Sequence, residues 1–172
     1  MAEFVLDASV AISWCFPGDP AEDTPYSRAV LSRLAVDDAI VPEIWAFEIA
    51  NNIFVSYSRR KRISERQVRE YLDLLKALPI RVEARSMIEN IDLESLARRR
   101  NFAAYDAAYL RLAQRMNLPL ATTDGTLRDA ALSEGIALNL SGSSPALATN
   151  TRAETPPRGS LRLRRPPDRI RS

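Results

Sequence analysis

Short apolar runs alternate with longer segments of helical spacing along the first 140 residues. A short apolar run bounded by polar residues is typical of a strand that is buried on both faces of a sheet. Such runs predict five strands: Phe4–Leu6, Ala39–Val41, Ile80–Val82, Leu118–Ala121 and Ile136–Leu140. Apolar residues spaced three and four apart predict helices between them. These helices are Val10–Cys15, Tyr26–Val36, Glu43–Ser58, Glu65–Leu78, Met87–Arg99, Ala104–Met116 and Thr126–Ser133.

This alternation of strands and helices predicts an α/β fold. Strands joined by right-handed helical crossovers form a parallel sheet with helices on both faces. Such sheets bind ligands beyond the carboxyl ends of their strands. Asp7 and Asp124 each follow a predicted strand, so we expect both carboxylates in that crevice.

Two further acids lie within apolar helices. The helix from Glu43 is apolar on almost every side, which predicts that it is buried. It contains Glu48, with Asn51 and Asn52 three and four residues further on. A buried carboxylate needs a partner, so Glu48 either pairs with an arginine, accepts hydrogen bonds from these asparagines or takes part in chemistry. Asp106, which has apolar helical neighbours, is either a functional acid or an acid of the first helical turn favoured by the helix dipole.

Asp7 and Asp124 also have ordinary structural explanations. Asp7 with Ser9 can cap the following short helix, and Asp124 followed by Gly125 can form a turn. The four acids together, however, can meet at one crevice. Two carboxylates about 5 Å apart repel each other by roughly 3 kcal/mol at an effective dielectric constant near 20, so four in one pocket require cations or shared protons. Mg²⁺ or Mn²⁺ prefers such oxygen ligands and can activate water for phosphodiester hydrolysis.

Composition narrows the chemistry. The sequence has no histidine and one cysteine, Cys15, which excludes histidine-based triads, histidine metal sites and an internal disulfide. No apolar run reaches the roughly 18 residues of a membrane span. The first residues also lack the basic start and longer apolar core of a secretory signal. We therefore expect a cytoplasmic protein that works with carboxylates, hydroxyls and amides.

Four short segments, in this order, resemble the PIN-domain ribonucleases of the VapC toxin type. The likeness covers about residues 3–140 and rests on the ordered set, because no single segment is specific. The segments are Val-Leu-Asp-Ala-Ser (5–9), Glu-Ile-Ala-Asn (48–51), Tyr-Asp-Ala-Ala-Tyr-Leu (105–110) and Leu-Ala-Thr-Thr-Asp (120–124).

The resemblance implies a three-layer α/β/α domain with a five-stranded parallel sheet that binds Mg²⁺ or Mn²⁺ and cuts single-stranded or loop RNA. It also implies a small antitoxin partner and, for many members, a homodimer. Matched by position, the catalytic and metal-binding acids are Asp7, Glu48, Asp106 and Asp124. The polar residues that orient the acids or the waters of the metal are Ser9, Asn51 and Thr122.

One position departs from the family pattern. Ala103 stands where members often carry Ser or Thr three residues before the third acid. A helix that lacks an N-cap side chain loses about 1 kcal/mol, unless Asn101 caps it instead.

Basic and aromatic residues suggest binding surfaces. Two basic runs, residues 59–62 and 98–100, either steer RNA phosphates towards the acids or are solvated helix ends. Aromatic side chains are usually core, but they can also stack on bases or form a groove for an antitoxin helix. The aromatic residues concerned are Trp14, Phe16, Trp45 and Phe47.

Residues 141–172 differ from the predicted domain over residues 1–140. They hold five of the eleven prolines and show no sustained periodicity, which predicts a disordered tail. The tail has seven arginines and two acids, a net charge of +5, so the remainder of this +2 chain carries −3. It either raises nonspecific RNA affinity or is dispensable.

The leading hypothesis is a Mg²⁺-dependent endoribonuclease, the toxin of a toxin-antitoxin pair. The alternative is a noncatalytic PIN-like module that binds RNA or a protein. A phosphotransferase of the haloacid dehalogenase kind also uses an Asp after its first strand, but it needs a second Asp two residues on, where this chain has Ser9.

Overall fold

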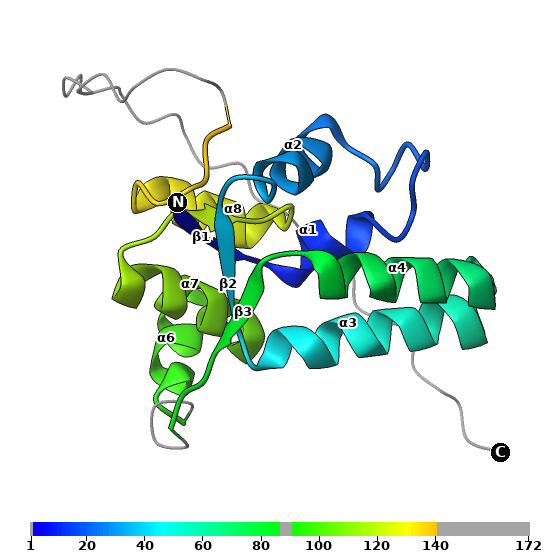
Figure 1. Ribbon diagram of the computed structural model, residues 1–172. Coiled ribbons are helices and arrows are strands. Elements are labelled where there is room, and N and C mark those ends of the chain that lie inside the picture. Colours follow the sequence, from blue (N-terminus) through cyan, green and yellow to red (C-terminus); the bar gives the residue numbers. More distant parts are fainter. Residues whose placement is uncertain (1, 87–90, 141–172) are drawn as a thin grey trace, which may run out of the picture. The chain divides into compact units, whose positions relative to one another are not determined.

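The computed structural model describes residues 2–86 and 91–140 (Figure 1). Within them, four parallel strands form a sheet in the order β3-β2-β1-β4. The strands are β1 (Glu3–Leu6), β2 (Asp38–Pro42), β3 (Ile80–Glu83) and β4 (Leu120–Ala121). The predicted α/β class with a parallel sheet is confirmed.

The fifth predicted strand, Ile136–Leu140, is only a bridge. Ala137 pairs with Leu120 in a single parallel bridge, supported by backbone hydrogen bonds from Leu120 N to Ile136 O (2.6 Å) and from Leu138 N to Leu120 O (2.8 Å). Because β4 is two residues long, it has few backbone groups with which a further strand could pair. The sheet is therefore four-stranded, and the five-stranded expectation is corrected.

Helices occupy the segments between the strands close to the predicted positions. The predicted helix from Met87 is described from Leu93 onward, and residues 87–90 lie outside the described residues, as does the predicted tail, 141–172. The helices are α1 (Ala8–Ser13), α2 (Pro25–Arg33), α3 (Ile44–Phe54) with the π-helical η1 (Val55–Arg59), α4 (Glu65–Ala77), α6 (Leu93–Arg100), α7 (Ala104–Met116) and α8 (Gly125–Ser133).

Local signals set the ends of several helices. Thr24 caps α2 by accepting from Ser27 N, and Pro25 occupies the first helical position, where its missing N–H costs nothing. Ser64 and Gln67 form a capping box at the start of α4. Asn101 and Asn117 end α6 and α7 in the left-handed conformation that asparagine tolerates.

The strand order creates a crevice at the end of the central strand. The chain runs from β1 outward through β2 to β3 and then returns to place β4 on the other side of β1. Right-handed crossovers in opposite directions put α1–α4 on one face and α6–α8 on the other. In agreement, α7 packs on β1, β2 and α8, whereas α1 contacts α2 and α3. The carboxyl ends of β1 and β4 therefore flank the point where ligands of such sheets bind.

The core is built on the central strands and α7. Val5 and Leu6 of β1 and Ile40 of β2 are fully buried, as are Tyr109 and Leu110 of α7. Val5 pairs with Ile40 on one side and with Leu120 on the other, so β1 is covered by neighbouring strands along its length. None of the helices in the described part of the chain is both long and apolar enough to cross a lipid bilayer.

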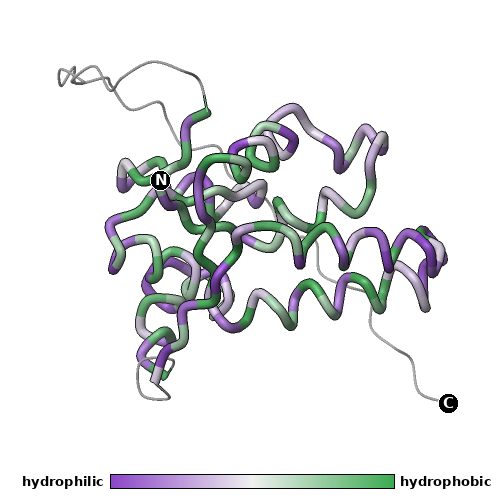
Figure 2. The backbone as a smooth tube through the Cα atoms, viewed as in Figure 1, coloured by the Kyte–Doolittle hydropathy of each residue, from purple (hydrophilic) through white to green (hydrophobic). Residues whose placement is uncertain are grey.

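The prediction that the helix from Glu43 is buried on all sides is wrong. Trp45 and Ile49 are buried, but Phe47 is 70% exposed and Phe54 is 50% exposed. The cause is visible in Figure 1, where α3 and α4 run side by side away from the sheet, and apolar (green) segments recur along both helices in Figure 2. The sheet and α1 cover only part of α3, so part of its apolar surface faces outward.

Candidate active site

Asp7 lies at the carboxyl end of β1 and is only 5% exposed. Its Oδ2 accepts hydrogen bonds from Ser9 Oγ (2.5 Å) and Thr122 Oγ1 (2.6 Å). The same two hydroxyls accept from the backbone, Ser9 Oγ from Thr123 N (3.1 Å) and Thr122 Oγ1 from Asp124 N (3.0 Å). This network fixes the Asp7 carboxylate between the end of β1 and the loop after β4.

Burial raises the pKa of Asp7 above its usual value. The hydrogen bonds from Ser9 and Thr122 act in the opposite direction because they stabilise the charged form, while the negative charge of Asp124 raises the pKa further. Asp7 occupies the N-cap position of α1, but a bond network shared with Thr122 goes beyond ordinary capping. The carboxylate is held rigidly in a state that favours a proton or a cation.

Asp124 is exposed and caps α8, as its Oδ1 accepts from Leu127 N (2.8 Å). The predicted structural role is thus present, in the form of a helix cap rather than a plain turn. Capping engages one carboxylate oxygen, and the charge of Asp124 raises the pKa of both Asp7 and Asp106. Asp124 therefore both starts α8 and contributes negative charge to the crevice.

Glu48 is half-buried on α3 and has a partner that the sequence did not indicate. The hydroxyl of Tyr109 donates to Glu48 Oε2, so the bond found in the described residues comes from neither an arginine nor an asparagine. Asn51 is exposed one turn further on, and Asn52 accepts from Ser56 Oγ (3.4 Å) instead. Burial, followed by the charges of Asp7 and Asp106, raises the pKa of Glu48, while the Tyr109 bond lowers it.

Tyr109 links three of the acid-bearing elements. It is fully buried on α7, three residues after Asp106, and its oxygen also takes part in a hydrogen bond with the backbone of Ala8, directly after Asp7. Burial and its bond to Glu48 raise its pKa, so the hydroxyl stays protonated and donates. The only sequence signal was the spacing of three residues from Asp106, which places both side chains on neighbouring positions of α7.

Asp106 lies in the first turn of α7 and is half-buried. Burial raises its pKa, and the charges of Asp124 and Asp7 add to the effect, whereas a hydrogen bond from the backbone of Ala103 lowers it. Ala103 is the N-cap and has no side chain to cap with, as expected. Asn101 does not replace it, because it ends α6 in the left-handed conformation.

The charges of the four acids act on one another's pKa values. Asp7 interacts with Asp124, Glu48 with Asp7 and Asp106, and Asp106 with Asp124 and Asp7. In the described ranges, 2–86 and 91–140, no three Asp, Glu, Cys or His side chains stand close enough to hold a metal ion as they are. The acids are electrostatic neighbours around one crevice rather than a preassembled cage.

A family model matches most of the chain. The model of the PIN domain family matches residues 4–132, which include all four acids. The chain belongs to the PIN domain family. PIN domains are typically nucleases, which are hydrolases, and they usually bind divalent metal ions. No curated protein matches the chain.

A solved structure shows the same fold. The crystal structure of PAE2754 from Pyrobaculum aerophilum matches with a TM-score of 0.51 and 17% sequence identity, over 74% of this chain and 78% of that one. At this level of identity the likeness supports the fold of this PIN domain alone.

The donors of this PIN domain suit a hard divalent cation. Three carboxylates have pKa values raised by burial and by one another, and a divalent cation relieves that repulsion. The thiol of Cys15 is buried and its pKa is raised to about 11, so it is a poor ligand at neutral pH. The available ligands are oxygens, as Mg²⁺ and Mn²⁺ prefer.

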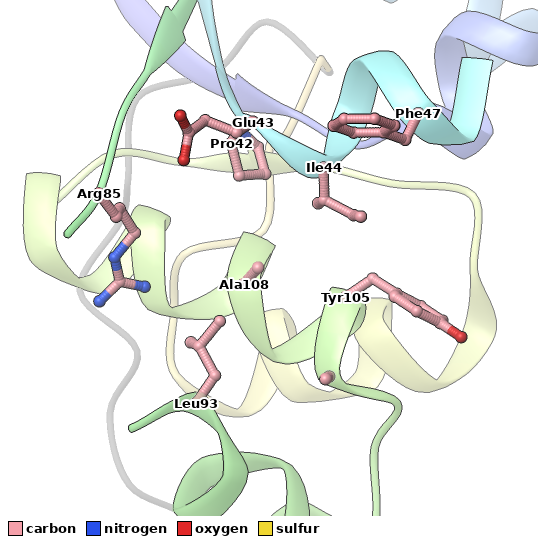
Figure 3. A pocket seen from close by; sticks show the side chains of 9 residues that line it. Pro42, Glu43, Ile44, Phe47, Arg85, Leu93, Tyr105 and Ala108 are labelled. Atoms are coloured by element: carbon pink, nitrogen blue, oxygen red, sulfur yellow. The ribbon is translucent and has the colours of Figure 1, made fainter. Parts of the chain in front are cut away.

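An apolar pocket flanks the acids on the α3 and α7 side. It has a volume of about 270 Å³, and Figure 3 shows Ile44 and Phe47 of α3 on one side and Tyr105 and Ala108 of α7 on the other. Phe47 and Tyr105, each next to an acid in sequence, are 70% and 51% exposed. Of the four predicted aromatic candidates, Phe47 is exposed, whereas Trp14, Phe16 and Trp45 belong to the core.

Several residues of the two basic runs form ion pairs within the fold. Arg62 pairs with Asp19 (3.0 Å) and Glu22 (3.3 Å) and stacks over the ring of Phe16. In the second run, Arg98 pairs with Glu94 (3.1 Å) and Arg100 pairs with Glu134. These pairs engage one of the four cations of the first run and two of the three of the second, which leaves fewer cations for RNA than the sequence suggested.

Proposed function

We propose that this PIN domain is a Mg²⁺-dependent endoribonuclease that hydrolyses RNA phosphodiester bonds, with Mn²⁺ able to replace Mg²⁺. The observation that carries the proposal is the set of three buried or half-buried acids, Asp7, Glu48 and Asp106, whose pKa values are raised by burial and by the charges of neighbouring acids, Asp124 included. A fold that keeps such acids together without neutralising them gains from a bound cation.

Each residue has a role in this proposal. Asp7, Glu48, Asp106 and Asp124 hold the metal. Ser9 and Thr122 hold Asp7 Oδ2 in place. When bound, the cation supplies positive charge for the phosphodiester transition state and activates water. We do not assign a histidine base, because the chain contains none. Asn51, exposed on α3, remains a proposed contact to the waters of the metal.

The test is cleavage of a mixed pool of structured RNAs by the full-length protein, with Mg²⁺, with Mn²⁺ and with EDTA. Asp7→Asn keeps the shape and the hydroxyl partners but removes the charge, so it should abolish cutting. Asp73→Asn, an exposed acid of α4, is the matched control and should cut normally. Hydrolysis should leave a 5′-phosphate and a 3′-hydroxyl. A cyclic phosphate product, or cutting that persists in EDTA, would overturn the mechanism.

We further propose that the protein is a toxin of the VapC type, works in the cytoplasm and is held inactive by a small antitoxin. The support is an apolar groove of about 500 Å³ between α3 and α4, lined by residues such as Ile49, Ile53 and Leu75. Trp45 also lines it, and its buried indole N–H has no acceptor within the described part of the chain. A partner helix with an apolar face would cover this groove.

Expression in a bacterial host tests the toxin proposal. The wild-type chain should arrest growth, Asp7→Asn should not, and the protein encoded next to it should restore growth and bind the wild type with 1:1 or 2:2 stoichiometry by light scattering. Normal growth with active wild-type protein present would contradict it. The same light-scattering measurement without the partner tests the proposed homodimer.

One observation favours the alternative of a noncatalytic PIN-like module that binds RNA or a protein. The acids do not stand at metal-holding distance within the described residues, as expected for a site that no longer binds metal. Under this alternative, Asp7→Asn leaves RNA or protein binding unchanged, and neither the wild type nor Asp7→Asn cuts RNA.

A further inference from the structure

A second pocket is lined by a residue that is hydrogen-bonded to Asp7. It has a volume of about 350 Å³ and lies between α2, the end of β4 and α8. Thr122 lines it, and the hydroxyl of the same Thr122 donates to Asp7 (2.6 Å). We call it the Tyr26 pocket, after the aromatic residue of α2 that lines it together with Arg128 of α8. Its volume is at the lower end for small-ligand sites, which suits one nucleotide rather than a longer segment.

Tyr26 is tied to the active-site loop. It is half-buried, and its phenol oxygen takes part in a hydrogen bond with the backbone of Thr122. Burial raises its pKa, and the charge of Asp7 contributes in the same direction, so the phenol is neutral at physiological pH and close enough to Asp7 to sense its charge. An aromatic ring anchored in this way offers a flat surface on which a base can stack.

Arg128 supplies a cation in the same pocket. It lies one turn after Asp124 on α8, it is exposed, and its charge acts on the Tyr26 phenol. The ion pairs in the described part of the chain involve many other arginines but not Arg128. A guanidinium that forms no ion pair in the described residues, one turn after Asp124, is suited to bind a phosphodiester.

Apart from Asn139, the remaining residues that line the pocket are apolar. Leu132 of α8 is 56% exposed at this pocket, and Leu138 forms part of its wall. The pocket thus offers a cation for the phosphate of a nucleotide, an anchored ring for its base and apolar side chains for the edges of its sugar.

We propose that the Tyr26 pocket binds one nucleotide of the RNA strand beside the bond that is cut, with the phosphate on Arg128 and the base against Tyr26. This proposal rests on the proposed function and adds where the substrate lies and which residues hold it. The pocket sets affinity and the position of the strand, while the acids carry out the reaction.

Arg128→Gln removes the positive charge of the pocket, and Tyr26→Leu removes its aromatic ring. Tyr26→Phe keeps the ring and loses only the hydroxyl. Arg111→Gln, an exposed arginine of α7 outside the Tyr26 pocket, is the matched control. Arg128→Lys retains a positive charge and guards against a folding defect in Arg128→Gln.

The measurements are the dissociation constant of short fluorescein-labelled single-stranded RNAs in EDTA, and kcat and KM for cleavage of the same RNAs in Mg²⁺. Arg128→Gln should weaken binding and raise KM by about tenfold, with kcat little changed. It should also lower the slope of log affinity against log salt by about one. Tyr26→Leu should weaken binding by a similar factor, Tyr26→Phe and Arg111→Gln by less than about twofold, and Arg128→Lys should fall between.

The outcomes distinguish this proposal from the proposed function. If the wild type binds and cuts RNA and both Arg128→Gln and Tyr26→Leu keep its affinity and KM, the pocket is not a nucleotide site and only this proposal fails. If the wild type neither binds nor cuts any of the RNAs, the proposed function fails and this proposal fails with it. If the wild type binds RNA without cutting it, the proposed function fails, and with it the assignment of this pocket to the strand beside the bond that is cut.

Discussion

Asp7 is the residue on which the candidate site depends most, because its carboxylate is buried and is still surrounded by other acids. Its two hydroxyl partners come from opposite ends of the chain, Ser9 and Thr122, and they hold one oxygen in place. Tyr109 does the same for Glu48. Hydrogen bonds therefore position two of the acids before any cation binds.

We expect Tyr109→Phe to weaken Mn²⁺ binding by about tenfold, the usual scale for losing a residue that orients a metal ligand. The substitution removes one oxygen and leaves Glu48 free to rotate. Calorimetric titration with Mn²⁺ measures the effect without relying on activity.

Tyr71→Phe is the matched control for this experiment. Tyr71 is also buried, but its hydroxyl donates to Ala11 O (2.9 Å), away from the acids. Both variants should lose about 1 kcal/mol of stability, and only Tyr109→Phe should lose Mn²⁺ affinity. Equal Mn²⁺ affinities in the two variants would show that Tyr109 does not position Glu48.

The raised pKa of Asp7 makes the stability of the metal-free protein depend on pH. Without metal, the folded state holds the Asp7 proton more tightly than the unfolded state, so the folded state binds more protons between the ordinary pKa and the raised one. The contribution of Asp7 to the free energy of unfolding is therefore fully present below its ordinary pKa of 3.8. It is lost as the pH rises through the raised pKa of the folded state.

In EDTA, Asp7→Asn should consequently melt at a higher temperature than the wild type at pH 7, with the difference shrinking as the pH falls towards 4. Adding Mg²⁺ at pH 7 should raise the melting temperature of the wild type and leave that of Asp7→Asn unchanged. Differential scanning calorimetry measures both. A wild type that is more stable than Asp7→Asn at pH 7 in EDTA contradicts the sign.

Among the elements, α7 combines two functions: it supplies Asp106 and the Tyr109 bond, yet it starts without a side-chain cap. The Asp106 carboxylate bonds back to the backbone of Ala103, which is one half of a capping box. A serine at position 103 would supply the other half.

Ala103→Ser should therefore raise the free energy of unfolding by about 1 kcal/mol, measured by urea titration. Ala104→Ser, one residue into the helix, cannot act as the N-cap and should give no gain. If both variants behave alike, capping does not limit the stability of α7.

The outward face of α3 gives a further prediction about protein stability. Phe47 is 70% exposed, so Phe47→Ser should change the free energy of unfolding of the monomer by less than about 0.5 kcal/mol. Trp45→Ala, on the buried side, should cost about 3–5 kcal/mol. A loss of several kcal/mol on Phe47→Ser that depends on protein concentration would instead reveal a second copy on this face.

These elements also show what the sequence could and could not predict. Short apolar runs correctly placed β1, β2, β3 and β4, whereas the joint role of Asp7, Glu48 and Asp106 stays a prediction from the motifs. Apolarity alone could not distinguish a buried α3 from one that projects beyond the sheet, because exposure depends on where α4 and the sheet lie. The bond from Tyr109 to Glu48 was also invisible, because it joins residues 61 positions apart, and no local spacing encodes such a contact.

For the whole molecule, the domain and the tail differ in charge, at −3 for residues 1–140 and +5 for residues 141–172. Deleting the tail should leave kcat for RNA cleavage unchanged, since the acids, Tyr109 and the Tyr26 pocket all precede it. If the tail binds RNA nonspecifically, the full chain should lose affinity more steeply with salt than a chain that ends at Leu140. Equal salt slopes would show that the tail is dispensable for binding.

The position of β1 in the centre of the sheet has a consequence for protein synthesis. β1, which Asp7 directly follows, is synthesised before its neighbour β4 and before the partners Thr122 and Asp124. An unfinished chain therefore lacks the bonds that orient its first acid. Under the proposed nuclease function, the site would be complete only after β4 has been made, which would spare the messenger and the ribosome that are still producing the chain.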